Sequence, residues 1–283
     1  MSAEIPAARL ERLRELVSST GVVSLRDAQR ALGVSVMTVR RDFAALEERG
    51  LVRRTRGGVI AVGRVVADRP YTERSERELE AKAAIGLRAA DLVDEGDTIF
   101  LSGGTTCLEL ARALSTRQDL TVITTSQLVL TVLMANPGLT VIATGGRADN
   151  LNSDLSGPVA ESTLARFRTR KAFIGASGIT ADGVFNSNLD RGTADRLMVA
   201  GSAETFVLAD HTKVGTAALA LVAPLSEVRG VVTDRLPDQA DQTWLAGKGV
   251  AVVVASDDVP SEAGPVGLTD TAGSATREKG RSQ

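Results

Sequence analysis

The sequence predicts two domains, a small winged helix-turn-helix domain followed by an α/β domain with a mainly parallel sheet. Three helix-length apolar patterns fill the start of the chain, and a short basic run with glycines follows them. From residue 97 onward, short apolar runs of strand length alternate with helical patterns. Buried parallel strands that helices cover on both faces have this appearance. A chain of 283 residues is long enough to form both cores.

The first domain is predicted at residues 1–62, where glycines and cap residues mark the ends of three helices. The first helix is expected at 7–19, and the second at 25–32 behind the cap residue Ser24. The third follows Ser35, whose hydroxyl can accept a backbone N–H of the first helical turn. Apolar residues recur along it at three- and four-residue spacing, namely Val36, Val39, Phe43 and Leu46.

The surface of the third helix opposite this apolar stripe is small, polar and cationic. At 100° per residue, Met37, Thr38 and Arg41 point away from the stripe, and Arg40 lies on its flank. A short helix with such an outer face is typical of proteins that contact bases in a DNA groove.

A basic wing and an uneven charge distribution also favour contact with DNA. Strands at 51–52 and 58–61 would form the wing. Its basic residues are Arg53, Arg54 and Arg56. Residues 1–60 hold 11 Arg and 7 acidic residues, so they carry +4, while the rest of the chain carries −6 of the total of −2. One alternative is a solvated helix face, and the cap, the wing and the uneven charge argue against it. The other is a winged helix that binds protein, and the arginine-rich outer face and the lack of exposed apolar residues other than Met37 argue against it.

The composition argues against several other classes of protein. A single cysteine excludes an intramolecular disulfide and a Cys-based zinc site, and we expect neither a metal nor a cofactor. The start of the chain lacks a signal-peptide apolar region, and no apolar run approaches 18 residues. A cytoplasmic protein without a membrane partner is therefore expected. Cys107 is expected in the core, and His211, the single histidine, in a hydrogen-bonded loop.

Residues 63–74 are polar with one proline, and they are interpreted as a linker. A charged helix is expected from about 72 to 92. Its inward residues would be Ala83, Ala84, Leu87 and Ala90. The second domain is placed at 75–255. The segment 256–283 is rich in Ser, Gly, Pro, Asp and Thr, which predicts a disordered tail.

Within the second domain, seven apolar runs predict strands. These runs lie at 98–101, 120–124, 139–143, 171–174, 205–208, 230–233 and 249–254. Helical patterns between them lie at 107–114, 127–135, 157–165 and 193–200.

Small-residue loops follow successive predicted strands, at the edge where open α/β sheets bind ligands. Glycine lets the backbone approach an anion, hydroxyls donate hydrogen bonds, and a helix N-terminus adds partial positive charge. The predicted effector-binding residues are Ser102, Gly103, Gly104, Thr105, Thr106, Thr125, Ser126, Gly145, Gly146, Arg147, Asp210 and Lys213. One such loop is equally consistent with a tight turn, whereas several together predict a site for a phosphorylated small molecule.

An enzyme is the main alternative function. A sugar-phosphate isomerase needs a base beside its substrate carbon, normally a carboxylate. Asp149, Asp182, Asp190 and Asp210 lie in predicted loops, so the sequence leaves turnover open.

The chain resembles the DeoR-type bacterial regulators over about residues 5–255. In the first domain the matching positions are Val34-Ser35, Thr38 through Phe43, Leu46-Glu47, Gly50-Leu51, Arg54-Thr55 and Gly57-Gly58. In the second domain they are Lys82, Gly96 through Leu101, Gly104-Thr105-Thr106, Gly145-Gly146, Gly157-Pro158, Lys171 through Gly175, Leu208-Ala209-Asp210 with Lys213, and Val232-Thr233-Asp234.

The resemblance implies a sensor domain, built like the sugar-phosphate isomerases, that binds a phosphorylated sugar or related metabolite and controls a catabolic operon. Such regulators usually repress and usually act as homodimers or homotetramers. The chain departs from the family pattern at Thr125, where Asn is common, and at Arg56, where His is usual. It also has Arg191 and then Asp195-Arg196 where the family usually has Glu and then Lys-Arg.

Under this interpretation, the third helix contacts an operator in double-stranded DNA. Met37, Thr38 and Arg41 would face base edges, and Ser35 would cap the helix close to the DNA backbone. The residues expected to neutralise phosphates are Arg40, Arg53, Arg54 and Arg56. Effector binding would alter the spacing of the DNA-binding domains through the helix at 72–92.

Overall fold

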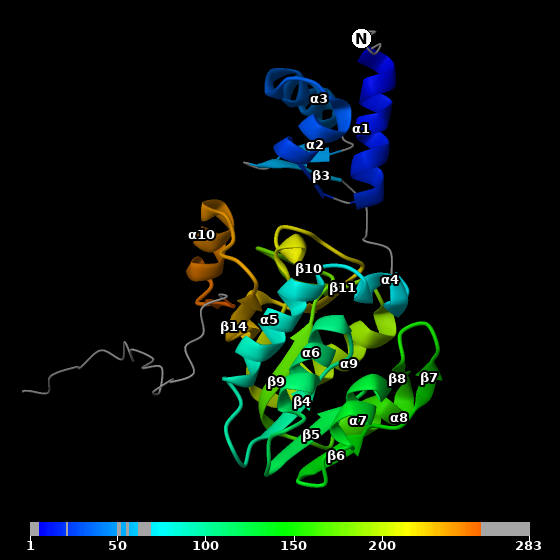
Figure 1. Cartoon of the computed structure of the whole chain (residues 1–283), viewed down its shortest axis with the longest axis vertical. Helices are drawn as coiled ribbons and strands as arrows, with labels where there is room; N and C mark the ends of the chain where they lie inside the picture. Colours follow the sequence, from blue (N-terminus) through cyan, green and yellow to red (C-terminus); the bar gives the residue numbers. More distant parts are fainter. Residues whose placement is uncertain (1–5, 21, 50–51, 55–56, 62–68, 256–283) are drawn as a thin grey trace, which may run out of the picture.

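The computed structural model describes residues 6–20, 22–49, 52–54, 57–61 and 69–255 (Figure 1). They form a head domain, residues 6–61, and a C-terminal domain, residues 69–255. The expected tail at 256–283 lies outside the described residues.

The head contains three helices and a three-stranded antiparallel sheet. Its elements are α1 (Pro6–Thr20), β1 (Val22–Ser24), α2 (Leu25–Leu32), α3 (Val36–Glu48), β2 (Val52–Arg54) and β3 (Gly58–Ala61), with the strand order β1-β3-β2. The three helices and the wing confirm the predicted winged helix-turn-helix. The strand β1 is not predicted from the sequence, because three residues are too few to show a period-two pattern.

Local capping and one close backbone contact explain how the head elements meet. The Ser24 and Ser35 hydroxyls accept the N–H groups of Asp27 and Thr38, at 3.1 and 3.3 Å, as their cap positions predict. Gly33 ends α2 in the left-handed region with φ of 65°, which turns the chain sharply into α3. A Cβ on Gly58 would lie 2.1 Å from the Val23 carbonyl oxygen, so only glycine lets β3 approach β1 this closely.

A seven-stranded parallel sheet forms the centre of the C-terminal domain, as predicted. Its strands are β4 (Thr98–Leu101), β5 (Leu120–Thr124), β6 (Leu139–Ala143), β9 (Thr169–Gly175), β12 (Ser202–Leu208), β14 (Gly230–Thr233) and β15 (Ala251–Val254). Their order is β15-β14-β12-β9-β4-β5-β6, and every neighbouring pair is parallel. The carboxyl ends of these strands therefore lie along one edge.

Helices cover both faces of the sheet (Figure 1). The helices α5 (Leu79–Ala90), α6 (Thr105–Leu114) and α7 (Gln127–Leu133) pack on one face. The helices α8 (Pro158–Leu164), α9 (Leu189–Ala200) and α10 (Gln239–Gly247) pack on the other. Successive strand residues alternate between the two cores, so Ile99 and Leu101 face the first and Phe100 the second.

Two small antiparallel sheets extend the domain beyond the predicted elements. One is the hairpin of β7 (Arg147–Asp149) and β8 (Asp154–Ser156). The other joins β10 (Gly178–Thr180), β11 (Gly183–Asn186) and β13 (Ala220–Ala223). These strands have three or four residues each, which is too short for a sequence pattern to identify them. Two 3₁₀ turns, η1 (His211–Lys213) and η2 (Leu225–Glu227), complete the fold.

The expectation of one continuous helix over 72–92 is wrong. The structure has two helices, α4 (Tyr71–Ser75) and α5, and the chain turns between them at Glu78, whose φ is 49°. The expected inward face is right only in part: Ala90 is buried and Ala84 packs against the core, but Ala83 is exposed and Leu87 is 64% exposed. The buried residues of α5 are Lys82, Ile85, Gly86, Ala89 and Ala90. A Cβ on Gly86 would lie 2.6 Å from the Glu109 backbone, so close packing on α6 determines which face is buried.

The end of the expected linker belongs to the C-terminal domain. The Tyr71 N–H donates to the Leu151 carbonyl at 3.0 Å, and Arg74 Nη2 donates to Asn152 Oδ1 at 2.8 Å. The Lys82 ammonium holds the next turn by donating to the carbonyl oxygens of Arg74, at 2.6 Å, and Arg77. The helix α4 is therefore fixed on the hairpin of β7 and β8.

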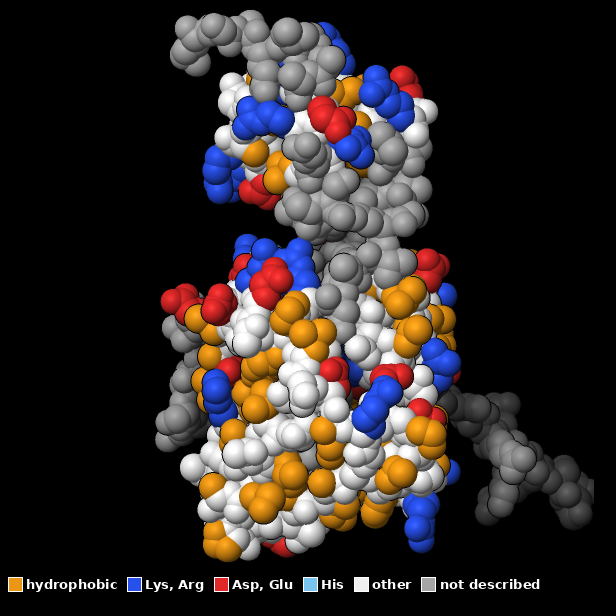
Figure 2. Space-filling model, turned by 90° about the vertical axis from the view of Figure 1, so that its right-hand side faces the viewer, with side chains coloured by type: hydrophobic (Ala, Val, Ile, Leu, Met, Phe, Trp, Pro, Cys, Tyr) orange, Lys and Arg blue, Asp and Glu red, His pale blue; other side chains and the backbone are white. Residues whose placement is uncertain are grey.

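Large apolar side chains that remain exposed are scattered over the C-terminal domain. They include Leu79 and Leu87 on α5, Met134 after α7, and Leu189 at the start of α9. Figure 2 shows hydrophobic groups distributed over the face it presents, and basic side chains on both flanks of the head.

Candidate functional site

The outer face of α3 carries the residues predicted to contact DNA. Met37 is 70% exposed, Arg40 and Arg41 are exposed, and Thr38 is half-buried beside Ser35. The Ser35 and Thr38 hydroxyls lie 3.0 Å apart. The opposite stripe is buried at Val39, Phe43 and Leu46. Val36, also expected in this stripe, is 37% exposed at the start of the helix, so the predicted amphipathic division is present from Val39 onward.

A buried ion pair, which sequence reasoning missed, fixes the orientation of α3. Asp42 is 5% exposed, and its two carboxylate oxygens accept from Arg9 Nε at 2.7 Å and Nη2 at 3.0 Å. This bidentate contact links α1 to α3 at the residue that follows the exposed arginines. Asp42, the residue after Arg40 and Arg41, therefore has a structural role and holds α3 in a fixed orientation against α1.

The wing is described only in part. Glu47 Oε1 accepts the backbone N–H of Arg54 at 3.0 Å, and the Arg54 side chain is exposed. The side chain of Arg53 and the whole of Arg56 lie outside the described part of the chain, as does Gly50.

In the C-terminal domain, the predicted loops do line the carboxyl edge of the sheet. Ser102, Thr105 and Thr106, after β4, are buried. Gly104 precedes α6, whose N-terminus has no side-chain cap. Thr125 and Ser126 after β5 are also buried, and the Ser126 hydroxyl caps α7 at the Val129 N–H at 3.4 Å.

The Gly145-Gly146 turn packs against other parts of the protein and leaves no space for a ligand at Gly146. Both glycines have positive φ, and a Cβ on Gly146 would lie 2.6 Å from the Ser156 carbonyl oxygen. Arg147 follows, exposed, and its guanidinium pairs with Asp190. The contact with β8 thus explains Gly146, and the positive φ of 69° explains Gly145.

Asp210 and Lys213 form a separate group at the ends of β12 and β14. Lys213 Nζ lies 3.2 Å from Asp210 Oδ2, and the Thr212 N–H donates to Asp210 Oδ1 at 3.0 Å. Next to them, His211 Nδ1 lies 2.8 Å from Asp234 Oδ2. The histidine is a hydrogen-bonded loop residue, as expected.

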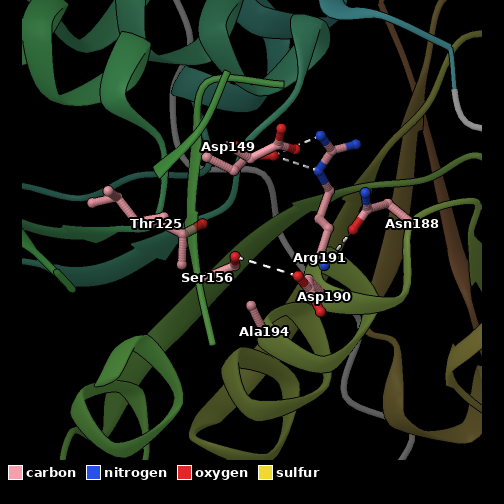
Figure 3. Close-up of a pocket in the computed structure, with 9 residues that line it drawn as sticks. Thr125, Asp149, Ser156, Asn188, Asp190, Arg191 and Ala194 are labelled. Atoms are coloured by element: carbon pink, nitrogen blue, oxygen red, sulfur yellow. Dashed lines mark hydrogen bonds and ion pairs between the residues drawn. The ribbon is translucent and has the colours of Figure 1, made fainter. Parts of the chain in front are cut away.

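A pocket opens between the 124–126 loop, the hairpin of β7 and β8, and the start of α9 (Figure 3). Its lining comprises Thr125, Asp149, Asp154, Leu155, Ser156, Asn188, Asp190, Arg191 and Ala194. Of the predicted effector residues, Thr125 alone belongs to this lining. The pocket lies at the predicted edge of the sheet, but most of the side chains that line it were not among the predicted residues.

A buried ion pair dominates the pocket. Arg191 donates from Nε at 2.8 Å and from Nη2 at 2.6 Å to the same oxygen, Asp154 Oδ2. Burial raises the pKa of Asp154 more than the Arg191 charge lowers it. The other oxygen, Asp154 Oδ1, is buried, has no hydrogen-bond partner among the described residues, and lies against Gly103, where a Cβ would meet it at 2.0 Å.

Behind this pair, a second carboxylate is fully buried. Asp195 accepts from the Ser102 hydroxyl and, at 2.9 Å, from Asn186 Nδ2. Burial raises its pKa to about 7, against the two hydrogen bonds and the Arg191 charge. Asn186 and Asp154 were missed by sequence reasoning. Arg191 and Asp195 were noted as departures from the family pattern, and their spacing of four residues places them on one face of a helix.

The carboxylates proposed as isomerase bases do not form one group. Asp149 and Asp190 line the pocket, Asp182 is exposed in the turn after β10, and Asp210 lies in the separate group described above. Burial opposes ionisation of Asp149, but the Asn152 amide and the Leu151 N–H hold its pKa below the usual value.

The described residues also bear on metal binding and on membrane insertion. Within them, no group of three or more His, Cys, Asp or Glu side chains is placed to hold a metal ion. No helix of this described part has the length and apolar character needed to cross a membrane.

Comparison with known proteins gives matches over both domains. The profile of the DeoR-like helix-turn-helix domain matches residues 9–65, and that of the DeoR C-terminal sensor domain matches 77–235. The HTH-type transcriptional regulator YgbI of Escherichia coli is 34% identical over 255 residues, which cover 90% of this chain and 100% of that protein. The HTH-type transcriptional repressor GlcR of Bacillus subtilis is 32% identical, over 88% of this chain and 96% of that protein.

A solved ribose 5-phosphate isomerase A from Methanocaldococcus jannaschii aligns with a TM-score of 0.37 and 19% identity, over 48% of this chain and 54% of that one. Likeness at that level carries no argument about activity. The two family profiles and the relatives matched over nearly their whole length do identify the family. The chain belongs to the DeoR family of transcriptional regulators.

Proposed function

We propose that this regulator represses an operon of carbohydrate catabolism and that a small metabolite modulates its affinity for the operator. The observation that carries the DNA-binding part is the exposed row Met37, Arg40 and Arg41 on a helix that the buried Arg9–Asp42 pair holds in place. Relatives include GlcR and the lactose phosphotransferase system repressor of Staphylococcus aureus, which is 29% identical. Their names support repression and a carbohydrate context.

In this proposal, α3 enters the major groove. Arg41 donates a fork of hydrogen bonds to guanine O6 and N7, while Met37 and Thr38 contact neighbouring base edges. The residues that neutralise phosphates are Arg40, Arg53, Arg54 and Arg56. Two heads of a homodimer, or of a dimer within a tetramer, would bind half-sites about 34 Å apart. Because operator DNA lies in the cytoplasm of a bacterial cell, the proposed location of the protein is the cytoplasm.

The effector, a phosphorylated sugar or a related metabolite, would bind at the carboxyl edge of the sheet. The uncapped N-terminus of α6 and the buried hydroxyls of the 102–106 and 124–126 loops support a polar ligand there. The hairpin of β7 and β8 supplies a route to the head, because it lines the pocket and also holds α4 through Leu151 and Asn152. Coupling of about 1–3 kcal/mol through such a contact would change operator affinity 5- to 150-fold.

The test is footprinting of the full-length protein on the DNA upstream of its own gene, with random DNA as competitor at moderate salt. We expect protection of two half-sites. An Arg40→Ala, Arg41→Ala double variant should lose it, whereas Arg30→Ala, an exposed change on α2, should keep it. Equal binding of promoter and random DNA by the wild-type protein would refute the proposal.

A further inference from the structure

The small antiparallel sheet of β10, β11 and β13 has one buried face and one outer face. Val184 and Val222 belong to the core on the side of α9, and a Cβ on Gly192 of that helix would lie 4.0 Å from Val222. Phe185 and Leu221 are paired across β11 and β13 and alternate with the buried residues, so both point to the outer face. Neither side chain belongs to a hydrophobic core of the described residues.

The outer face continues into the segment that precedes β13. Exposed and buried side chains alternate from residue 217 to 221, and the exposed ones are Ala217, Leu219 and Leu221. Leu219 is 49% exposed and Leu221 is 41% exposed. A Cβ on Gly183 would lie 2.7 Å from Leu221 Cδ1, so the Leu221 side chain lies over β11. We refer to Phe185, Ala217, Leu219 and Leu221 together as the outer sheet face.

The composition of the outer sheet face is the reverse of what contact with water favours. In an antiparallel sheet that has one face on a core, the other face normally carries polar residues. The strands β10, β11 and β13 contain no charged residue, although 24% of the whole chain is charged. The exposed leucines of α5, in contrast, have charged neighbours, since Glu80 follows Leu79 and Arg88 follows Leu87. Contiguous exposed apolar surface that lacks charge is typical of a contact with another protein.

This contact must be made by the face of the sheet, because the edge of β13 is already closed. Arg196 on α9 donates to two successive carbonyl oxygens of that strand, those of Leu221 and, at 3.3 Å, Val222. Successive carbonyls of a strand point to opposite edges, so one of the two lies on the edge away from β11. A further strand would have to displace this guanidinium before it could pair with β13.

The C-terminal tail of the chain is a poor match for the outer sheet face. Residues 256–283 contain only three large aliphatic side chains, Val259, Val266 and Leu268, and they also contain eight charged residues. A second copy of the same face matches it in shape and in charge, because two uncharged pleated faces can stack about 10 Å apart with their side chains interdigitated. We infer that two copies of the chain pair through the outer sheet face about a two-fold axis, with Leu219 and Leu221 at the centre of the contact.

The position of this face suits the proposed function, on which the choice of a second copy rests. Two half-sites require two heads, and a two-fold axis in the protein matches the symmetry of such an operator. In Figure 1, β10 and β11 lie at the same end of the C-terminal domain as α4, the helix by which the chain enters this domain from the head. Pairing through the outer sheet face would bring the two α4 helices to one end of the dimer.

The experiment measures the association of the full-length protein by sedimentation equilibrium over a range of micromolar concentrations. We expect the wild type to form a dimer. Leu221→Glu places a carboxylate of each copy against the apolar face of the other, and should raise the Kd of the dimer by about tenfold or more. Leu87→Glu, a change of the same kind at an exposed leucine of α5, is the matched control and should associate like the wild type.

A charge exchange distinguishes a second copy from any other occupant of the face. Leu221→Lys alone should weaken the dimer as Leu221→Glu does, because two like charges then face each other across the axis. An equal mixture of the two variants should recover the association, since opposite charges then face each other. A face that contacts its own chain or a different protein would show no such recovery.

Crosslinking provides an independent measurement. The native Cys107 is fully buried, and burial raises the pKa of its thiol, so a thiol introduced at the surface is the reactive one. A short bismaleimide should join two chains of the Leu219→Cys variant and leave chains of the Leu87→Cys variant separate.

The inference is overturned if the wild type is a monomer at all these concentrations, if Leu221→Glu associates like Leu87→Glu, if the mixture fails to recover the association, or if the two cysteine variants crosslink equally. These outcomes are distinct from failure of the proposed function. A dimer that depends on Leu221 but binds promoter and random DNA equally would sustain the interface and refute the proposed function. Equal protection of two half-sites by Leu221→Glu and Leu87→Glu would sustain the regulator and remove this interface.

Discussion

The helices α3 and α9 both carry arginines central to the candidate sites, but in opposite environments. Arg40 and Arg41 on α3 are exposed, whereas Arg191 on α9 is 7% exposed and forks onto Asp154. An exposed guanidinium keeps its donors available for an external anion, such as a DNA phosphate or a guanine edge. A buried guanidinium must be neutralised within the protein. The same residue type is therefore available for the proposed recognition of DNA in the head, whereas in the sensor domain it is part of the pocket architecture.

Breaking the buried pair should have the largest effect. Arg191→Met leaves the Asp154 carboxylate buried and uncompensated, so the sensor domain should lose about 3–5 kcal/mol of unfolding free energy. The readout is urea unfolding followed by fluorescence of Trp244, the single tryptophan, which lies on α10 of that domain.

The matched control for that change is Arg147→Met, because Arg147 pairs with Asp190 with 73% of its side chain exposed. An exposed pair contributes about 0–1 kcal/mol. If the two variants lost the same stability, burial would not be what separates these arginines.

The buried Asp195 should make the stability of the sensor domain depend on pH. Its pKa is about 7 in the folded state and near 3.8 when unfolded, so between these values the folded state holds a proton that the unfolded state has lost. Stability from this group is present below pH 4 and is lost as pH rises to 7. Asp195→Asn should therefore stabilise the domain more at pH 8 than at pH 5, by an amount on the order of 1–3 kcal/mol. A gain that is equal at both pH values, or the same dependence in Asp182→Asn, would contradict this.

On α3, substitution of an exposed arginine should change DNA binding and leave the stability of the fold unchanged. Arg41→Ala should reduce the preference for operator over random DNA by about 1–3 kcal/mol. Its thermal stability should stay near that of the wild type, since exposed changes typically shift it by less than about 0.5 kcal/mol. Gel-shift titrations with both DNAs measure the preference, with Arg30→Ala as the control. An unchanged ratio would remove Arg41 from base recognition.

The smallest expected effect is that of a single phosphate contact in the wing. Arg54→Ala should weaken operator and random DNA alike, and lower the slope of log affinity against log salt by about 0.9. Titrations at three salt concentrations measure it. A changed operator preference with an unchanged slope would place Arg54 at a base edge instead.

The sequence predicted the regular elements well because their signals are local. Ser24 and Ser35 cap the next helices, and the apolar stripe of α3 follows its period of 3.6 residues. The seven apolar runs after residue 97 are the seven strands of the parallel sheet. The buried face of α5 was predicted only in part, because it depends on how closely Gly86 approaches α6, which is a contact between separate elements.

For the candidate site, the sequence by itself determined the exposed cationic face of α3 and the edge of the sheet at which the pocket lies, since helical periodicity and strand-loop order fix both. The tertiary structure alone decided the pocket. Asp154 stands 37 residues from Arg191, and Ser102 stands 93 from Asp195. No local sequence pattern relates residues so far apart. Folding brings their charges together, and burial then determines which charges are neutralised and which acceptor atom is left without a partner among the described residues.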